Sequence, residues 1–282
     1  MLNTARKIAI ARVVSTVLLR SGMRPQRRVR RNGILFNLDI REGVDLSIFL
    51  FGSFQRHVAA LIKRFVPPDG IVIDVGANIG AVALPIAKHL TTGHVYAVEP
   101  TDFAFSKLLE NVALNPSLAK RITAVRTFIS DGTRPCSDMR AYSSWPLAST
   151  PQATHPVHKG VVMHASCGQL TLDDFVAESG LQSLSLIKID TDGHEYEVVA
   201  GARESINRFR PVVVFEACEY LMRPPRPTFE NLSVLFKSVG YTVCSATVEP
   251  LTPEAFLHIC PKGGGLDLVA LPREHADSPF DT

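Results

Sequence analysis

The chain has 282 residues, of which 46% are hydrophobic and 20% are charged, and its formal net charge is +3. These values suit one soluble domain with a small N-terminal addition, and no internal repeat or low-complexity tract is visible. The cysteines form no Cys-x-x-Cys pair, which excludes a disulfide framework and a cysteine zinc site and predicts a reducing, cytoplasmic location. They are Cys136, Cys167, Cys218, Cys244 and Cys260.

Residues 1–32 are expected to form a basic N-terminal arm. Residues 1–38 hold nine of the 30 basic residues and none of the 27 acidic ones, so the rest of the chain is net negative. Apolar residues between Ile8 and Leu18 predict an amphipathic helix, which is too short to span a membrane. One interpretation is peripheral contact with an anionic membrane surface near a lipid-linked substrate. The other is a solvated helix that packs on the domain or on a second subunit.

Residues 33–275 are expected to form one domain, followed by a tail at 276–282. Within it, strand patterns alternate with helix patterns, which predicts an α/β fold with a mostly parallel sheet and helices on both faces. Only a loop is expected between the last two strands, which should pair antiparallel. The expected strands are 34–40, 44–50, 71–75, 94–99, 122–129, 184–190, 211–217, 241–246 and 266–271. The expected helices are 54–65, 79–90, 102–114, 171–179, 195–209 and 228–239.

The segment Ile71-Val-Ile-Asp-Val-Gly-Ala-Asn-Ile-Gly80 predicts a buried strand, a tight turn and a helix start. Gly76 and Gly80 permit a positive φ and a close approach of a ligand to the backbone. Asp74 would repel a pyrophosphate, and no lysine follows the turn, which excludes a Walker-type phosphate loop. A ligand with a positive centre and a ribose, such as S-adenosylmethionine (SAM), fits better. Alternatively, the small residues serve packing only.

The next strand pattern ends in Glu99, which Pro100 follows. A carboxylate at the end of the neighbouring strand can accept hydrogen bonds from both hydroxyls of a ribose. The alternative is an ordinary solvated acid at a strand end. Acids at two consecutive strand ends favour the nucleoside site.

A third cluster follows the strand at 184–190, where Lys188, Asp190, Asp192, His194 and Glu195 surround one turn. Together with the two earlier segments, this sequence resembles the FkbM family of SAM-dependent methyltransferases. The resemblance rests on Asp-Val-Gly-Ala-Asn-Ile-Gly (74–80), Ala-Val-Glu-Pro (97–100) and Leu-Ile-Lys-Ile-Asp-Thr-Asp-Gly-His-Glu (186–195), and further matches lie at 199–202 and 211–216. It covers roughly residues 33–271. The family usually has Glu where Asp192 stands.

The resemblance implies a Rossmann-like class I methyltransferase fold, with a seven-stranded, mostly parallel sheet whose last strand is antiparallel. It also implies SAM as cofactor. Glu99 would accept the ribose hydroxyls, Ser130 or Asp131 would approach the adenine amine, and Asp190 would face the transferring methyl. The methionine and ribose part would lie against Asp74, Gly76, Ala77, Asn78 and Gly80.

Methyl transfer to a neutral hydroxyl benefits from a base that takes the hydroxyl proton. Asp190 and His194 are the two candidates, and Lys188 would hold Asp190 ionised. Alternatively, His194 caps the following helix and Lys188 is a buried ion-pair partner. Asp190, Asp192 and His194 are also conceivable ligands of a divalent metal, but no metal is expected.

Residues 133–168, which include Trp145, form a long segment expected to be a substrate loop or lid. Residues 51–57 could close over the cofactor from the other side. The expected activity is O-methylation of a hydroxyl on a glycan or sugar-containing metabolite. Alternatives are O- or N-methylation of a polyketide or peptide, and a catalytically silent SAM-binding protein. No nucleic-acid partner is expected, and the sequence does not indicate an oligomeric state.

Overall fold

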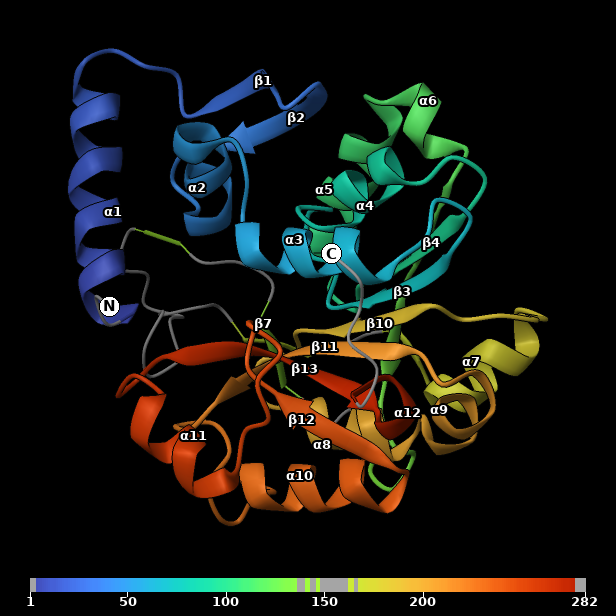
Figure 1. Ribbon diagram of the computed structural model, residues 1–282. Helices are drawn as coiled ribbons and strands as arrows, with labels where there is room; N and C mark the ends of the chain where they lie inside the picture. The colour runs from blue at the N-terminus through green and yellow to red at the C-terminus, as the bar shows by residue number, and fades with distance from the viewer. Residues whose placement is uncertain (1–3, 136–139, 143–145, 148–161, 165–166, 277–282) are drawn as a thin grey trace.

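A seven-stranded sheet forms the centre of the protein (Figure 1). The computed structural model describes residues 4–135, 140–142, 146–147, 162–164 and 167–276. The sheet confirms the expected α/β class, because every strand pair is parallel except those made by the last strand. In spatial order its strands are β12 (Tyr241–Cys244), β13 (Gly265–Pro272), β11 (Val212–Cys218), β10 (Leu186–Ile189), β3 (Ile71–Val75), β4 (His94–Val98) and β5 (Ile122–Val125).

Helices cover both faces of this sheet, as Figure 1 shows. Successive residues of a strand point to opposite faces, so Val72 packs into one core cluster and Ile73 into the other. The first cluster includes residues of α3 (Arg56–Phe65), α4 (Ala83–His89) and α5 (Asp102–Ala113). The second includes residues of α7 (Leu172–Glu178), α8 (Glu195–Ala200), α9 (Arg203–Phe209) and α10 (Phe229–Ser238). The domain also contains three short helices, α6 (Pro116–Ala119), α11 (Pro253–Ile259) and α12 (Arg273–Ala276).

The sheet order reverses direction between β3 and β10. From β3 the chain proceeds through β4 to β5 at one edge, and it then returns to β10 and continues through β11 toward the other edge. In open α/β sheets, ligands bind outside the carboxyl ends of the strands at such a point. The topology therefore places the expected turn at 76–80 beside the cluster at 188–195.

The N-terminal segment contains α1 (Thr4–Arg20), a hairpin of β1 (Gln26–Arg31) and β2 (Ile34–Asp39), and α2 (Gly43–Phe51). The expected boundary between arm and domain, at residues 32–33, falls in the turn of this hairpin. The hairpin therefore links the two by backbone pairing. Helix α1 packs against α2, and Ser15 Oγ donates a hydrogen bond to Ile40 O at 2.9 Å. No helix in the described ranges is long and apolar enough to cross a bilayer.

The predicted strand at 44–50 was wrong, because this segment is helix α2. A short run of mostly apolar residues has no decisive period, so sequence alone cannot separate strand from helix. The helix is fixed by tertiary contacts: Asp45 is buried, accepts a hydrogen bond from Asp39 N at 2.6 Å and pairs with Lys107. Gly52, with φ 78°, ends the helix, and this terminating glycine was the available sequence signal.

Three other predicted elements differ from the structure. The helix expected at 195–209 is interrupted at Gly201, where a Cβ would lie 2.1 Å from Ser130 O, and it continues as α9. The strand expected at 122–129 divides into β5 and β6 (Thr127–Ile129), and β6 pairs with β9 (Gly168–Leu170) outside the main sheet. Helix α11 lies between the last two strands, where only a loop was expected.

Most of the expected substrate loop at 133–168, with Trp145, lies outside the described residues, as do residues 277–282 of the expected tail. Two short antiparallel strands of that loop are described, β7 (Arg140–Tyr142) and β8 (Val162–His164). Their pairing brings residues 140–142 and 162–164 of the loop side by side.

The turn after β3 holds three strand ends together. Gly76 N and Ala77 N both donate to Val98 O at 2.9 Å, which links the turn to β4. Gly76 has φ 79°, and a Cβ on it would lie 1.9 Å from Asp190 O, just past β10. Only glycine permits both this backbone conformation and this approach.

We expect Gly76→Ala to destabilise the protein more than Gly180→Ala. Gly180 has φ 63°, and a Cβ added to it would meet nothing within 4 Å, so its substitution tests conformational strain alone, about 1–2 kcal/mol. Gly76→Ala adds a collision with backbone oxygen and should cost at least about 2 kcal/mol more. Urea unfolding of both variants measures the difference, and equal losses would contradict the close approach.

Candidate active site

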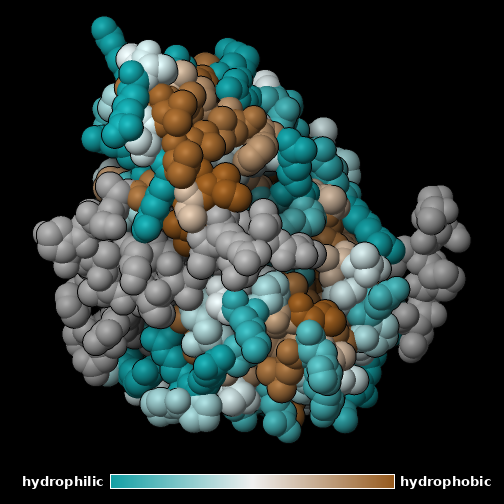
Figure 2. Space-filling model, turned by 90° about the vertical axis from the view of Figure 1, so that its left-hand side faces the viewer, coloured by the Kyte–Doolittle hydropathy of each residue, from teal (hydrophilic) through white to brown (hydrophobic). Residues whose placement is uncertain are grey.

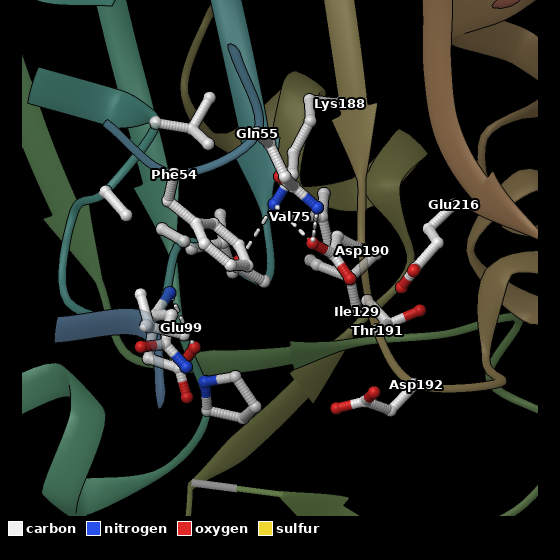
Figure 3. A pocket seen from close by; sticks show the side chains of 18 of the residues that line it. Phe54, Gln55, Val75, Glu99, Ile129, Lys188, Asp190, Thr191, Asp192 and Glu216 are labelled. Carbon is white, nitrogen blue, oxygen red and sulfur yellow. Dashed lines mark hydrogen bonds and ion pairs between the residues drawn. The ribbon is translucent and has the colours of Figure 1, made fainter. Parts of the chain in front are cut away.

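A pocket opens at the carboxyl ends of β3, β4, β10 and β11 (Figure 3). Its apolar wall includes Phe54, Val75, Val98, Phe128 and Ile129. Six of the residues predicted from sequence line it, and they are Gly76, Ala77, Asn78, Glu99, Lys188 and Asp190. Segments more than a hundred residues apart in the chain therefore meet at the point where the sheet order reverses.

Lys188 is the buried cation at the base of the pocket. Its Nζ lies 3.0 Å from Asp74 Oδ1 and 3.6 Å from Asp190 Oδ2, and it donates a hydrogen bond to Gly76 O at 3.0 Å. Lys188 is in register with Asp74 on the neighbouring parallel strand. Burial alone would lower the pKa of the Lys188 ammonium, but the carboxylates of Asp74 and Asp190 outweigh it and raise that pKa. The lysine therefore stays charged and cross-links β3, its turn and β10.

Asp190 is held from two sides. Besides Lys188, Gln55 Nε2 donates a hydrogen bond to Asp190 Oδ2 at 3.0 Å. Gln55 and Phe54 both line the pocket, so the expected segment 51–57 does reach it. Figure 3 shows Gln55 and Lys188 converging on the Asp190 carboxylate. Gln55 was not predicted individually, because nothing in its local sequence indicates a contact 135 residues away.

Glu99 is the acid at the other end of the pocket, and 4% of its surface is exposed. Its Oε1 accepts hydrogen bonds from Thr101 N at 3.0 Å and Thr101 Oγ1 at 2.5 Å, and its Oε2 accepts one from Asn78 N at 3.0 Å. Burial raises the pKa of the Glu99 carboxyl, and these hydrogen bonds oppose that effect. A carboxylate oxygen accepts two hydrogen bonds, so Oε2 retains capacity for a ligand hydroxyl.

Two of the predicted residues lie beneath the pocket wall and not in it. Asp74 is fully buried under Lys188, which it pairs with. Gly80 faces the core, where a Cβ would lie 3.0 Å from Leu108 and 3.3 Å from Leu84. Both residues therefore position the lining of the pocket.

Ser130, Asp131 and His194 are also absent from the lining. Ser130 Oγ accepts a hydrogen bond from Gln169 Nε2 at 2.6 Å, and Asp131 Oδ1 accepts one from Thr133 N at 3.0 Å. His194 is buried, and its ring stands edge-on to Phe128 at 5.3 Å between centroids. It occupies the N-cap position of α8, but its side chain makes no capping hydrogen bond. Phe128 thus separates His194 from the pocket.

Sequence reasoning gave no role to Glu216, which lines the pocket from within β11, two residues before that strand ends. The available sequence signal was an acid near the carboxyl end of the apolar strand pattern at 211–217. Asp192 also lines the pocket, in a turn where it has φ 53°. That turn is held by buried Glu195, whose Oε1 accepts from Thr191 N at 3.1 Å. Burial raises the pKa of Glu195 to about 7.

Most of the titratable side chains that line the pocket are acids. Four acids line it, Glu99, Asp190, Asp192 and Glu216, and Lys188 is the one lysine or arginine among the described lining residues. Two carboxylates already engage that lysine. The pocket therefore favours a ligand with a positive charge and disfavours a pyrophosphate. In the described part of the chain, no three His, Cys, Asp or Glu side chains converge as a metal site.

The sheet order with one antiparallel strand, together with the pocket at the strand ends, defines a Rossmann-like methyltransferase fold. Residues 74–243 match the model of the methyltransferase FkbM domain. The chain belongs to this family, as its three motifs predicted.

Among curated relatives, the chain is 25% identical over 164 residues to the 2-O-methyltransferase NoeI of Sinorhizobium fredii, which covers 55% of this chain and 65% of that protein. It is 26% identical over 165 residues to the hexuronic acid methyltransferase AglP of Haloferax volcanii, which covers 57% and 61%. The matched segments thus span less than two thirds of either relative. Among solved structures, a methyltransferase FkbM from Methylobacillus flagellatus is similar with 16% identity, a TM-score of 0.44, and 72% of this chain and 44% of that chain covered.

We expect Lys188→Met to cost about 3–5 kcal/mol of unfolding free energy, because it leaves Asp74 buried without a counter-charge. Arg126→Ala is the control, since Arg126 pairs with Asp102 at the surface, where both side chains are about half exposed. That change should cost no more than about 1 kcal/mol. Urea denaturation checks both values, and similar small losses would show that the buried pair is not a structural requirement.

Proposed function

We propose that this protein is a SAM-dependent O-methyltransferase that methylates a hydroxyl of a glycan or sugar-containing metabolite. The observation that carries the proposal is the acid-rich pocket built on the glycine turn in a member of the FkbM family. A sulfonium and an ammonium group give SAM the positive charge that this pocket favours, and the one lysine among the described lining residues already pairs with two carboxylates.

The residues present fit SAM. The free acceptor capacity of Glu99 Oε2 suits a ribose hydroxyl, and Gly76 and Ala77 line the pocket where the methionine part would lie. Phe128 and Ile129 offer an apolar wall for a purine. When bound, SAM would supply an activated methyl group on a positively charged sulfur. This chain would orient the donor and the acceptor oxygen in line, and positioning of this kind supplies much of the acceleration.

Asp190 would help to set that geometry. Lys188 and Gln55 fix its carboxylate, so it is already oriented before a ligand enters. A fixed negative charge at this position would favour the sulfonium electrostatically without reorganisation.

The names of two curated relatives support a glycan acceptor. NoeI is a 2-O-methyltransferase, and AglP is a hexuronic acid methyltransferase. At about one quarter identity, and with less than two thirds of each relative matched, these names support a class of acceptor and not a particular sugar.

Titration calorimetry with SAM and with NAD tests the cofactor. We expect SAM to bind and NAD not to bind. Glu99→Gln should weaken SAM about 10- to 100-fold, because it removes a charged acceptor and turns an amide N–H toward backbone donors. Glu230→Gln, at an exposed position on α10, is the matched control and should leave SAM affinity unchanged. Binding of NAD without SAM would overturn the proposal.

The acceptor class requires a separate experiment. Labelled SAM is incubated with a neutral hexoside, a hexuronic acid glycoside, a hydroxylated peptide and a polyketide alcohol. We expect label on a sugar acceptor. Label on the peptide or polyketide alone would refute the glycan acceptor but leave the methyltransferase activity standing. If the protein binds SAM but labels none of these acceptors, and no component of crude cell extract, it is a catalytically silent SAM-binding protein.

A further inference from the structure

The carboxyl group of Glu216 stands at the end of the pocket opposite Glu99, with no partner among the described residues. Strand alternation puts Lys188, Asp190 and Glu216 on the same face of the sheet, because β10 and β11 are in parallel register. Figure 3 shows the Glu216 carboxyl on the side of the pocket where Asp190 and Thr191 lie, away from Glu99. Within the described residues, no side chain or backbone group forms a hydrogen bond or ion pair with it. The carboxyl is therefore free to meet a ligand.

The two bases expected from sequence are less suited to the task. Asp190 Oδ2 is already engaged by Lys188 and Gln55, so that oxygen has less room to accept a hydroxyl proton. His194 lies behind Phe128 and does not line the pocket. A base must be within hydrogen-bond reach of the proton it removes, so Glu216 has the better position.

We propose that Glu216 is the general base that accepts the proton of the acceptor hydroxyl. This inference rests on the proposed methyltransferase function. In the step, the acceptor oxygen forms a bond to the methyl carbon while the carbon–sulfur bond breaks, and that bond's electron pair stays on sulfur. The O–H electron pair stays on the acceptor oxygen, and the proton moves to the Glu216 carboxylate. The products are the methyl ether, S-adenosylhomocysteine (SAH) and protonated Glu216.

The surroundings of Glu216 favour basicity. Burial raises the pKa of its carboxyl well above the usual value, and the nearby carboxylates of Asp190, Asp267, Asp192 and Glu195 raise it further. A carboxylate with a raised pKa removes a proton more effectively than an ordinary one. Other titratable or charged groups that face this cluster are Lys188, Cys218, Tyr220 and His57, and His57 contacts Asp267.

The same argument predicts how the base becomes ionised. A positive charge that enters the pocket lowers the pKa of a nearby carboxyl, so SAM, with its sulfonium, should drive a proton off Glu216. SAH has no sulfonium and should do so much less. Binding of the methyl donor would thus prepare the base.

Calorimetry in buffers of different ionisation enthalpy counts the protons released when SAM or SAH binds. Near neutral pH we expect the wild-type protein to release more protons with SAM than with SAH. In Glu216→Gln this difference should disappear, while SAM still binds with an affinity within about threefold of wild type. An unchanged difference in Glu216→Gln would overturn the proposal.

Turnover with the sugar acceptor gives a second readout. Glu216→Gln should lower kcat about 10²- to 10⁴-fold, the usual contribution of a general base, and should remove the rise of kcat with pH. Glu216→Asp keeps the carboxyl at a shorter reach and should retain intermediate activity. Glu219→Gln, which removes an acid that pairs with Arg223 at the surface, is the control and should be unchanged.

The outcomes separate this inference from the function on which it rests. Full turnover in Glu216→Gln, or a loss confined to Asp190→Asn, would reject Glu216 as the base and leave the methyltransferase proposal standing. Failure of the wild-type protein to bind SAM would reject both.

A second inference rests on independent observations and concerns the exposed outer side of α1. Ile10, Val13 and Val17 are 53%, 64% and 60% exposed, and their spacing puts them on one stripe of the helix. Arg20, also exposed, continues the stripe at the same spacing. Figure 2 shows a hydrophobic patch on this side of the molecule, with hydrophilic side chains around it.

The charge beside this stripe indicates what could cover it. Arg24, Arg28 and Arg30 follow the helix and are exposed, and no acid occurs in residues 1–38. None of these arginines, nor Arg20, forms an ion pair with a described acid. A second copy of this basic face would repel the first, whereas an anionic phospholipid surface complements both its charge and its apolar stripe. We infer that the outer face of α1 docks on an anionic membrane surface.

Vesicle flotation with the full chain tests the docking surface. We expect binding to vesicles that contain phosphatidylglycerol, weak binding to pure phosphatidylcholine, and loss of binding at high salt. The double variant Val13→Glu/Val17→Glu should abolish it, and Val234→Glu, at a position on α10 that is 60% exposed, should not. No flotation with anionic vesicles, or a dimer in light scattering that Val13→Glu/Val17→Glu dissociates, would overturn the inference.

Discussion

The structure of the pocket depends on one buried cation. Lys188 binds the carboxylate of Asp74, the carboxylate of Asp190 and the carbonyl of Gly76, so a single ammonium joins β3, the turn that follows it and the end of β10. A charge this deeply buried is tolerated only when its partners are fixed around it. The same contacts that satisfy the lysine therefore set the positions of the groups that would face a ligand.

Around Lys188, the acidic side chains of the pocket occupy distinct positions. Glu99 lies at one end, Asp190 is fixed in the middle, and Asp192 and Glu216 lie at the other end. The polar groups differ in how they are bound: Glu99 and Asp190 have several donors, whereas the Glu216 carboxyl has none among the described residues. Groups with fixed partners suit binding, and a group without them suits proton transfer. This division of roles follows from local environment, since all of these residues are carboxylic acids.

Much of the fold was predictable because its elements carry strong local patterns. The buried strands at 71–75 and 186–189 are mostly apolar, with Asp74 inside the first and Asp190 directly after the second, and the sheet follows from the alternation of such strands with helices. The predictions failed where local pattern was ambiguous, as in α2, which is fixed by the distant contact between Asp45 and Lys107. At the site, the motifs predicted Gly76, Glu99 and Asp190 in the pocket, but not that Phe128 separates His194 from it.

The sequence alone determined the family and the type of fold, because these depend on residue type and on spacing within short segments. Only the tertiary structure decided which side chains reach the pocket. Gln55 contacts Asp190 across 135 residues, and Glu216 lines the same pocket from the neighbouring strand. Such contacts depend on strand order and register, which place distant residues side by side, and no local pattern in the chain encodes them.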